Sequence, residues 1–398
     1  MKRAIILLTI SFLSHQGFSQ LDSLARNLVD TIRHILIVDD IPRKTLGEKL
    51  MYPHRWYVKQ LLAPKVPAYD TNYIKNQKHK LTITVPVAKK FYGFNLTDLE
   101  KKRTMRFSPN NYYHVGFNFS NIILTFGFSP GIKFGAKPNR GSTSSRDFQL
   151  TIIGRKVITD LNYQSYNGFY VYNTNDFKIS ETAGDTIVVR PDVNVTSFGI
   201  NTYYVFNSTK YSLRGAFSFT DVQKKSAGSF MAGVYHSHVV FSSNDSSFIR
   251  SPFMNDFSPL LSNINQISQI SAGLSGGYGY TFVIYKKFSY SIALNLGVGV
   301  QKTYYRTIDG SDESFKLNLA TNMNAKNALR YDNMRFFVGV LATYDNNFAF
   351  NEVMFNNTKY IARVVGFVGY RFNIKKNGRK VLKALGLVDY NQKKTSKK

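Results

Sequence analysis

The chain has 398 residues, of which 43% are hydrophobic and 19% are charged, so it is rich enough in apolar side chains to fold and is not a disordered chain. It has no Cys, which excludes a disulfide framework, a zinc–thiolate site, an iron–sulfur cluster and a cysteine nucleophile. After residue 14 no apolar run approaches the ~20 residues that a membrane helix needs, which excludes a helical membrane protein.

The formal net charge is +28, from 52 Lys and Arg against 24 Asp and Glu. A surplus of this size is compatible with nucleic-acid binding, but no helix-turn-helix, zinc finger or RNA-binding strand motif accompanies it. We therefore expect no nucleic-acid partner. The surplus serves solubility or contact with a membrane surface instead.

The first 19 residues have the three-part layout of a secretory signal peptide. Lys2 and Arg3 are followed by the apolar stretch Ala4 to Leu13 and then by small and polar residues. The apolar part is too short to span a bilayer. The sequence therefore predicts export, with cleavage near Ser19 and residues 1–19 absent from the mature protein.

Residues 20–78 differ from the rest of the chain and are expected to form a periplasmic N-terminal segment. Leu21 to Ile37 has apolar residues at helical spacing, and an irregular stretch with four Pro follows. This partly helical segment either folds back as a plug or lies at the rim of the following domain.

Between residues 79 and 374 the dominant pattern is strict alternation. From Ile270 to Ile284, and again from Phe288 to Gln301, bulky apolar side chains alternate with small polar ones. The short connection 285–287 makes these two segments a long β-hairpin. Segments 197–206 and 211–219, around the turn 207–210, and segment 363–372 follow the same rule. Weaker candidate strands are 82–94, 111–119, 121–129, 147–155, 157–172, 229–242, 331–345 and 347–357.

The length and polarity of these strands favour a membrane barrel over a secreted soluble β-protein, which remains the alternative. Soluble sandwich strands have about 5–6 residues, whereas these run to about 10–16. Their polar face is rich in Gly, Ser and Asn, and their bulky face ends in Tyr and Phe, as in barrels with an apolar outer face and aromatic girdles. We predict an all-β, antiparallel, up-and-down transmembrane barrel over residues 79–374. It would have about twelve strands, or fourteen if a further crossing lies in 243–266.

Residues 375–398 form a basic C-terminal tail after Phe372, which would be the terminal aromatic residue of the barrel. The tail either touches anionic lipid headgroups in the periplasm or is a solvated basic end.

Few residues suggest chemistry. His236 and His238 lie on one face of a strand, as lumen or rim residues, and no carboxylate set accompanies them, so we predict no metal site. Ser237, between them, points to the opposite face and cannot pair with them. Arg155, Arg363 and Arg371 are predicted to line the lumen, with Asp160 as a possible partner. We predict no catalytic residue and no cofactor.

The functional expectation follows from this lack of catalytic motifs. We expect a non-enzymatic outer-membrane barrel, either a small pore or a structural, interaction-bearing protein. The alternative is a rim-located lipid hydrolase or acyl-modifying enzyme, which needs a Ser–His pair and an orienting third group. The expected partners are outer-membrane lipid and the barrel-insertion machinery. An open pore would prefer anions, provided that the three lumen arginines are unpaired.

Several strings resemble a family of uncharacterised outer-membrane barrel proteins from Bacteroidota. They are Tyr69 to Ile74, Gly154 to Lys156 with Asp160, Tyr166 to Tyr170, Gln223 to Phe230 and Gly277 to Phe282. The most specific string has Gln223, Lys224, Lys225, Ser226 and Gly228. The resemblance covers roughly 65–374 and implies a barrel in the outer membrane. It implies no activity or catalytic residue, and the basic tail departs from it.

Overall fold

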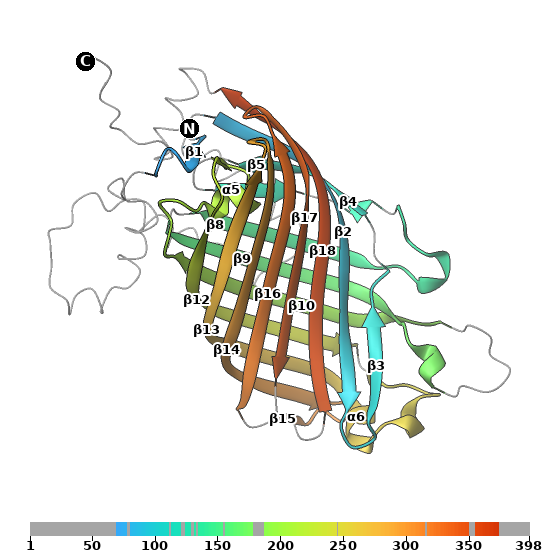
Figure 1. The fold of residues 1–398 in the computed structure, drawn as a ribbon. Helices are drawn as coiled ribbons and strands as arrows, with labels where there is room; N and C mark the ends of the chain where they lie inside the picture. The colour runs from blue at the N-terminus through green and yellow to red at the C-terminus, as the bar shows by residue number, and fades with distance from the viewer. Residues whose placement is uncertain are drawn as a thin grey trace, which may run out of the picture. The chain divides into compact units, whose positions relative to one another are not determined.

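The computed structural model describes residues 69–77, 80–110, 113–120, 124–128, 131–132, 134–153, 156–177, 187–244, 246–314, 317–349 and 355–373. All of them belong to one compact unit, residues 67–374. This unit is a closed barrel of antiparallel strands with few helical turns (Figure 1). Among the described residues, no helix is long and apolar enough to cross a membrane.

Ten strands of ten or more residues make up most of the wall. They are β2 (Lys80–Asp98), β8 (Ser144–Ile153), β9 (Val157–Val171), β10 (Val188–Val205), β12 (Ala227–Ser243), β13 (Ile264–Ile284), β14 (Phe288–Thr307), β16 (Asn318–Asp332), β17 (Phe336–Ala349) and β18 (Phe355–Asn373). The shorter strands are β1 (Ile74–Asn76), β3 (Arg103–Ser108), β4 (Tyr113–Val115), β5 (Phe117–Ser120), β6 (Leu124–Phe128), β7 (Gly131–Ile132), β11 (Asp221–Gln223) and β15 (Asp312–Ser314). The helical elements are α5 (Leu213–Phe217), α6 (Pro259–Asn263) and the 3₁₀ turns η1 (Pro138–Arg140), η2 (Thr174–Asp176) and η3 (Met254–Asp256).

The barrel closes where β18 pairs with β2, from Phe355 opposite Asp98 to Asn373 opposite Lys80. On the other side of β2, the short strands β5 and β6 complete the path to β8. Closure satisfies the backbone groups that a sheet edge would leave exposed. The predicted twelve or fourteen strands of crossing length are not confirmed, because β5 and β6 have only four and five residues.

Three segment predictions were wrong. Residues 211–219 are not a strand: the chain turns at 207–210 and forms α5, which Ser212 caps by accepting a hydrogen bond from the Gly215 amide. No hidden crossing lies in 243–266, whose described residues hold η3 and α6 before β13 begins at Ile264. The predicted range 331–345 overlaps β17, whereas 347–357 joins the end of β17 to the start of β18. β16 was not predicted, because charges and Asn residues interrupt its alternation.

In the middle of the barrel the outer face is apolar and the inner face is polar. On β14, Leu294 and Leu296 are 40% and 55% exposed, whereas Asn295 between them is 4% exposed and faces the lumen. This is the distribution of a barrel that is surrounded by lipid, and the opposite of a soluble barrel.

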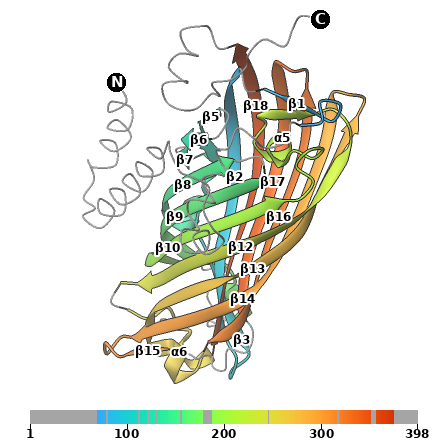
Figure 2. The same cartoon turned by 90° about the vertical axis from the view of Figure 1, so that its left-hand side faces the viewer.

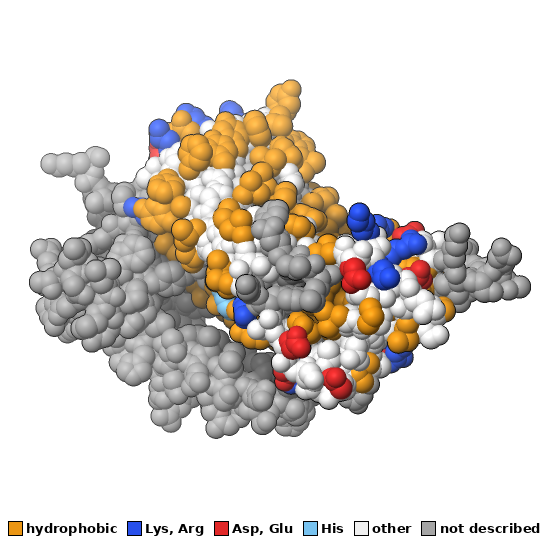
Figure 3. Space-filling view, turned by 90° about the horizontal axis from the view of Figure 1, so that it is seen from below, with side chains coloured by type: hydrophobic (Ala, Val, Ile, Leu, Met, Phe, Trp, Pro, Cys, Tyr) orange, Lys and Arg blue, Asp and Glu red, His pale blue; other side chains and the backbone are white. Residues whose placement is uncertain are grey.

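We call the end of the barrel that carries α6 the α6 end. Toward this end the inner face becomes apolar and the outer face becomes polar. On β13, Ile267 is buried inside the barrel, while Gln266 and Ser268 face outward. On β2, Phe94 and Leu96 are likewise buried inside. The same strands therefore form a membrane-type wall in the middle and a soluble-type wall at the α6 end. Figure 3, viewed toward this end, shows many hydrophobic side chains over one part of the surface and a group of Lys, Arg, Asp and Glu side chains over another.

An aromatic core fills the barrel at the α6 end. The ring of Phe94 lies 4.5 Å from that of Phe107 and 4.9 Å from that of Phe241, measured between ring centroids. Phe248 and Leu261, from the connection between β12 and β13, pack into the same cluster. Because such a core is packed like a protein interior, it closes this end of the lumen to water.

Candidate functional site: an occluded lumen

A segment between β10 and β12 turns into the opposite mouth of the barrel, the α5 end (Figures 1 and 2). We call residues 206–223, which include α5 and β11, the plug. Its Phe219 stacks on Phe367 of the wall with 4.1 Å between centroids and lies 5.6 Å from Phe337. Ala88, Ala328, Leu341 and Val365 complete this apolar contact between plug and wall.

Two wall arginines hold the backbone of the plug. Arg371, 1% exposed, donates to both carboxylate oxygens of Asp332 at 2.8 Å and to the carbonyl oxygen of Phe219 at 2.9 Å. Arg330 donates to the carbonyl oxygen of Gly215 at 2.7 Å. Phe219 has φ 59°, a left-handed conformation that bulky residues rarely adopt. The hydrogen bonds of Arg371 and the ring stacking hold this strained residue in place.

The string 223–228, singled out by its family resemblance, fastens the plug to its surroundings. The Gln223 side chain accepts from the Ser212 amide at 3.1 Å and donates to the carbonyl oxygens of Lys210 and Lys225. β11 pairs with β1, with Gln223 opposite Ile74.

The rest of the string ties the plug to neighbouring segments. Lys224 donates to the carbonyl oxygen of Thr71 at 2.7 Å, and Ser226 accepts from the Val283 amide at 2.9 Å. Gly228 sits against the Tyr278 and Tyr280 rings, so that a Cβ there would come within 2.5 Å of both. In this fold the string holds the plug against its neighbours.

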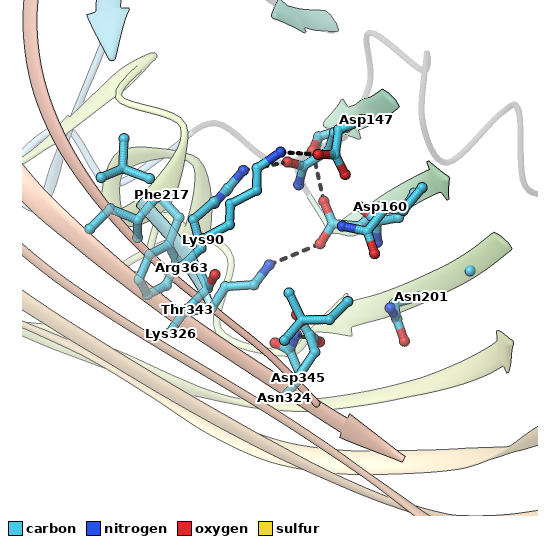
Figure 4. A pocket seen from close by; sticks show the side chains of 18 of the residues that line it. Lys90, Asp147, Asp160, Asn201, Phe217, Asn324, Lys326, Thr343, Asp345 and Arg363 are labelled. Atoms are coloured by element: carbon cyan, nitrogen blue, oxygen red, sulfur yellow. Dashed lines mark hydrogen bonds and ion pairs between the residues drawn. The ribbon is translucent and has the colours of Figure 1, made fainter. Parts of the chain in front are cut away.

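Between the plug and the aromatic core lies a polar cavity of about 290 Å³ (Figure 4). Phe217 and Phe219 border it on the plug side, and Ile361, which packs against the aromatic core, borders it on the other. Its charged lining residues are Lys90, Asp147, Asp160, Lys326, Asp345, Lys359 and Arg363.

Two ion pairs connect the walls of this cavity. Lys326 of β16 lies 2.9 Å from Asp160 of β9, and Asp160 also accepts from the Thr151 hydroxyl at 2.8 Å. Lys90 of β2 pairs with Asp147 of β8. The partner of Asp160 is thus a lysine that the sequence analysis had not selected. Arg155 lies outside the described residues.

Three further charges line the cavity without an oppositely charged partner. Arg363 donates to Gln149 at 3.0 Å, and Asp345 accepts from the Asn324 amide group. In the described part of the chain, none of Arg363, Lys359 and Asp345 takes part in an ion pair within 4.0 Å. Of the predicted arginines, Arg363 therefore lines the lumen unpaired with a carboxylate, whereas Arg371 is buried and paired with Asp332.

On β12 the histidine side chains alternate with the buried set and lie on the outer face, although His236 also borders the central cavity. Val234, His236 and His238 alternate with Tyr235, Ser237 and Val239, and the second set is buried. Ser237 thus faces away from both histidines. His238 Nε2 lies 3.1 Å from the Ser268 hydroxyl, on the outward face of the next strand. Within the described ranges, no group of three His, Asp or Glu side chains could hold a metal ion.

At the α6 end, beyond the point where the faces exchange chemistry, Asp98 ties a loop to the wall. One of its carboxylate oxygens accepts from the amides of Glu100 and Lys101 at 2.9 Å, and the other accepts from the Ser258 amide at 2.6 Å. Burial by itself raises the pKa of Asp98, but these hydrogen bonds outweigh it and hold that pKa below its usual range.

Most of the charged lining was missed by the sequence analysis. Lys90, Lys326 and Asp345 occur in strands that were weak, misplaced or unrecognised. A usable signal exists for Lys359 and Arg363, which are four residues apart on one face of a clear strand. Nothing in the sequence indicates which wall residues face each other across the lumen.

Comparison with known proteins gives a family and a set of distant structures. The family model described as a domain of unknown function (DUF4421) matches residues 68–372. No curated protein matches the chain.

The structural likenesses are to outer-membrane proteins at low identity. The outer membrane protease OmpT from Escherichia coli is 10% identical, with TM-score 0.34, over 77% of this chain and 99% of the protease. The COG4313 outer membrane channel from Pseudomonas putida F1 is 10% identical, with TM-score 0.27, over 77% of this chain and 100% of the channel. Ail, the attachment invasion locus protein of Yersinia pestis, is 14% identical, with TM-score 0.20, over 55% of this chain and 98% of Ail. Likenesses this distant carry no argument about activity.

Proposed function

The chain belongs to the family described as a domain of unknown function (DUF4421), and from that premise we propose that it is a non-enzymatic outer-membrane β-barrel with an occluded lumen. Such a barrel is a structural or solute-holding protein and not a freely conducting pore.

The occlusion of the lumen is the observation that carries this proposal. The plug fills the α5 end, where buried Arg371 and Arg330 hold its carbonyl groups. The Lys326–Asp160 pair crosses the middle, and the aromatic core fills the α6 end. Ions would have to displace charged pairs and packed rings to pass. Removing one partner of a buried pair alone costs several kcal/mol, on the order of 3–5.

The membrane placement rests on the outer face. Leu274, Leu294 and Leu296 belong to an apolar belt, and aromatic residues such as Tyr285 and Phe288 follow it toward the α5 end. Connections 285–287 and 333–335 are short and lie at the same end as the plug. Because short turns face the periplasm in such barrels, the plug would be periplasmic. The N-terminal signal peptide, outer-membrane lipid and the insertion machinery fit this placement. Counting β5 and β6 as wall strands gives twelve.

The test is conductance of the purified full chain in planar bilayers, with an open porin in the same bilayers as positive control. We expect insertion, shown by recovery of the protein in the lipid, without steady current. A steady ohmic current from the wild-type chain would reject the occluded lumen.

One observation favours a second candidate, the rim hydrolase. His238 Nε2 and the Ser268 hydroxyl are within hydrogen-bond distance on the outer face, near the boundary of the apolar belt. An orienting carboxylate or amide is also needed, and among the described residues none is hydrogen-bonded to His238. Fatty-acid release from phospholipid vesicles by the wild type, abolished in Ser268→Ala, would favour the hydrolase. Absence of release by the wild type would reject it.

A further inference from the structure

The charges that line the central cavity do not balance. The cavity holds four cations, Lys90, Lys326, Lys359 and Arg363, and three carboxylates, Asp147, Asp160 and Asp345. Two cations and two carboxylates are used in the pairs Lys90–Asp147 and Lys326–Asp160. What remains is Lys359 and Arg363 against Asp345, a surplus of one positive charge in a cavity that the plug and the aromatic core border with apolar side chains.

The three remaining charges sit together on two adjacent strands. On β18, Lys359 and Arg363 share the lumen face and are separated by about 13 Å along the strand. Asp345 of β17 pairs with Ile361 in the register, so it lies between the two cations at the diagonal positions, about 7–8 Å from each in Cα spacing. None of the three reaches another within 4.0 Å in the described part of the chain.

A cation that is taken out of bulk water without a partner is costly, and a bound anion removes that cost. Arg363 uses only Nη1 toward a protein group, the side-chain amide oxygen Oε1 of Gln149 at 3.0 Å. The rest of its planar guanidinium is free to bind a carboxylate or phosphate in the two-point geometry that Arg favours. Side-chain amides of Asn322 and Asn324 line the same cavity and supply further polar groups.

We propose that the central cavity binds a small oxyanion, a carboxylate or phosphate solute, with Arg363 and Lys359 as its ligands. The cavity of about 290 Å³ sets the size: it is at the small end of ligand pockets, so it admits a solute of a few carbon atoms and excludes a lipid. This inference rests on the occluded barrel proposed above, because an open, water-filled lumen would screen the two cations.

The experiment uses the purified full chain in detergent and isothermal titration calorimetry with two anionic probes, succinate and inorganic phosphate. Erythritol is the neutral probe and putrescine the cationic one. We expect at least one anion to bind, more weakly at higher ionic strength, and the neutral and cationic probes to stay silent. If neither anion binds, or if erythritol or putrescine binds equally well, the proposal is wrong.

Variants locate the site. Arg363→Gln and Lys359→Gln should each weaken anion binding at least tenfold, whereas Lys302→Gln, a change of a lysine on the outer face, should leave it unchanged. Among the described residues that line the cavity, Asp345 is the carboxylate outside an ion pair. Asp345→Asn removes its charge and should tighten binding several-fold, an outcome that misfolding cannot imitate. Binding that is unchanged in Arg363→Gln, or weakened in Asp345→Asn, contradicts the site.

The bilayer experiment separates this inference from the proposed function. A silent bilayer without anion binding would leave the occluded barrel intact and reject the site. Steady conductance would reject the occluded barrel itself. In that case, a loss of anion selectivity in Arg363→Gln would show that this cation attracts anions as they pass through the lumen.

Discussion

Lys326 and Asp160 are 166 residues apart in the chain and belong to opposite walls of the barrel, yet their side chains meet at 2.9 Å across the lumen. Lys326 belongs to β16 and Asp160 to β9. In the order of the sheet, four strands lie between them: β14, β13, β12 and β10. An ion pair in this place does two things: it neutralises two lumen charges, and it divides the space that an ion would have to cross.

The first prediction concerns this pair. Lys326→Met should destabilise the barrel by about 3 kcal/mol, because it leaves Asp160 in a low-dielectric site with only the Thr151 hydroxyl as donor. Asp160→Asn combined with Lys326→Met should recover most of the loss, since no charge is then stranded. Urea unfolding followed by the β-sheet circular dichroism signal measures both. Equal losses in the single and the double variant would show that the pair is not the cause.

The second prediction tests the exchange of chemistry between the faces of one strand. Leu274 and Gln266 both face outward on β13, and Leu274 is 71% exposed within the apolar belt. Leu274→Arg should impair folding into lipid by about 2–4 kcal/mol, the cost of Arg at a midplane lipid-facing site.

Its matched control is Gln266→Arg, on the same face but beyond the belt, which should change the folding free energy by well under 1 kcal/mol. Folding into vesicles is followed by the difference in gel mobility between unheated and boiled samples. If both substitutions impair folding to the same extent, the boundary of the belt does not lie between residues 266 and 274.

The third prediction concerns the anchor of the plug. Arg371→Gln removes the charge that pairs with Asp332 and the donors that hold the Phe219 carbonyl oxygen. Hydrogen exchange measured by mass spectrometry should therefore rise strongly in residues 211–223 and stay unchanged in the β13–β14 hairpin.

The double variant Arg371→Gln, Asp332→Asn is its control, because it removes the stranded carboxylate and leaves the plug without its anchor. Exchange in 211–223 should remain high there, even though global stability recovers. Protection of the plug equal to that of the wild type in Arg371→Gln would mean that ring stacking of Phe219 suffices.

The fourth prediction is a pH dependence at Asp98, which lies outside the apolar belt. Its pKa is lowered in the folded protein, so it contributes stability above the unfolded pKa, about 3.9, and loses it as the pH falls through the folded value. Asp98→Asn should be less stable than the wild type from pH 7 to about pH 5. The difference in urea midpoint should begin to shrink as the pH falls below the unfolded pKa and should close once the pH is below the lower, folded value. A difference that stays constant as the pH falls below the unfolded pKa would assign the effect to packing.

The sequence analysis was most successful where both faces of a strand are uniform. Ile270 to Ile284 and Phe288 to Gln301 were predicted as a hairpin, and the structure has β13 and β14 there with Tyr285 to Lys287 between them. Period-two alternation over that length has few other solutions.

Alternation misled at the plug, where Tyr211, Leu213, Phe217 and Phe219 have the spacing of a strand. In the structure the four side chains are used differently. Tyr211 and Leu213 pack in the cluster of Ile158 and Val205, and Phe219 packs against Phe337 and Phe367. Phe217 packs against both clusters. A buried segment surrounded by wall residues can present apolar groups on all sides, so its pattern does not report its conformation.

The composition and patterning of the chain by themselves determined an all-β protein with long strands, an apolar outer face on β13 and β14, and no cysteine chemistry. Only the tertiary structure decided which charges meet. The structure pairs Lys326 with Asp160 and anchors Phe219 through Arg371, although the partners are distant in sequence. Among the described residues, it also leaves Lys359 and Arg363 in the cavity without an ion pair. Alternation fixes the face to which a side chain points, and it contains no information about strand order or register, which set the partner across the lumen.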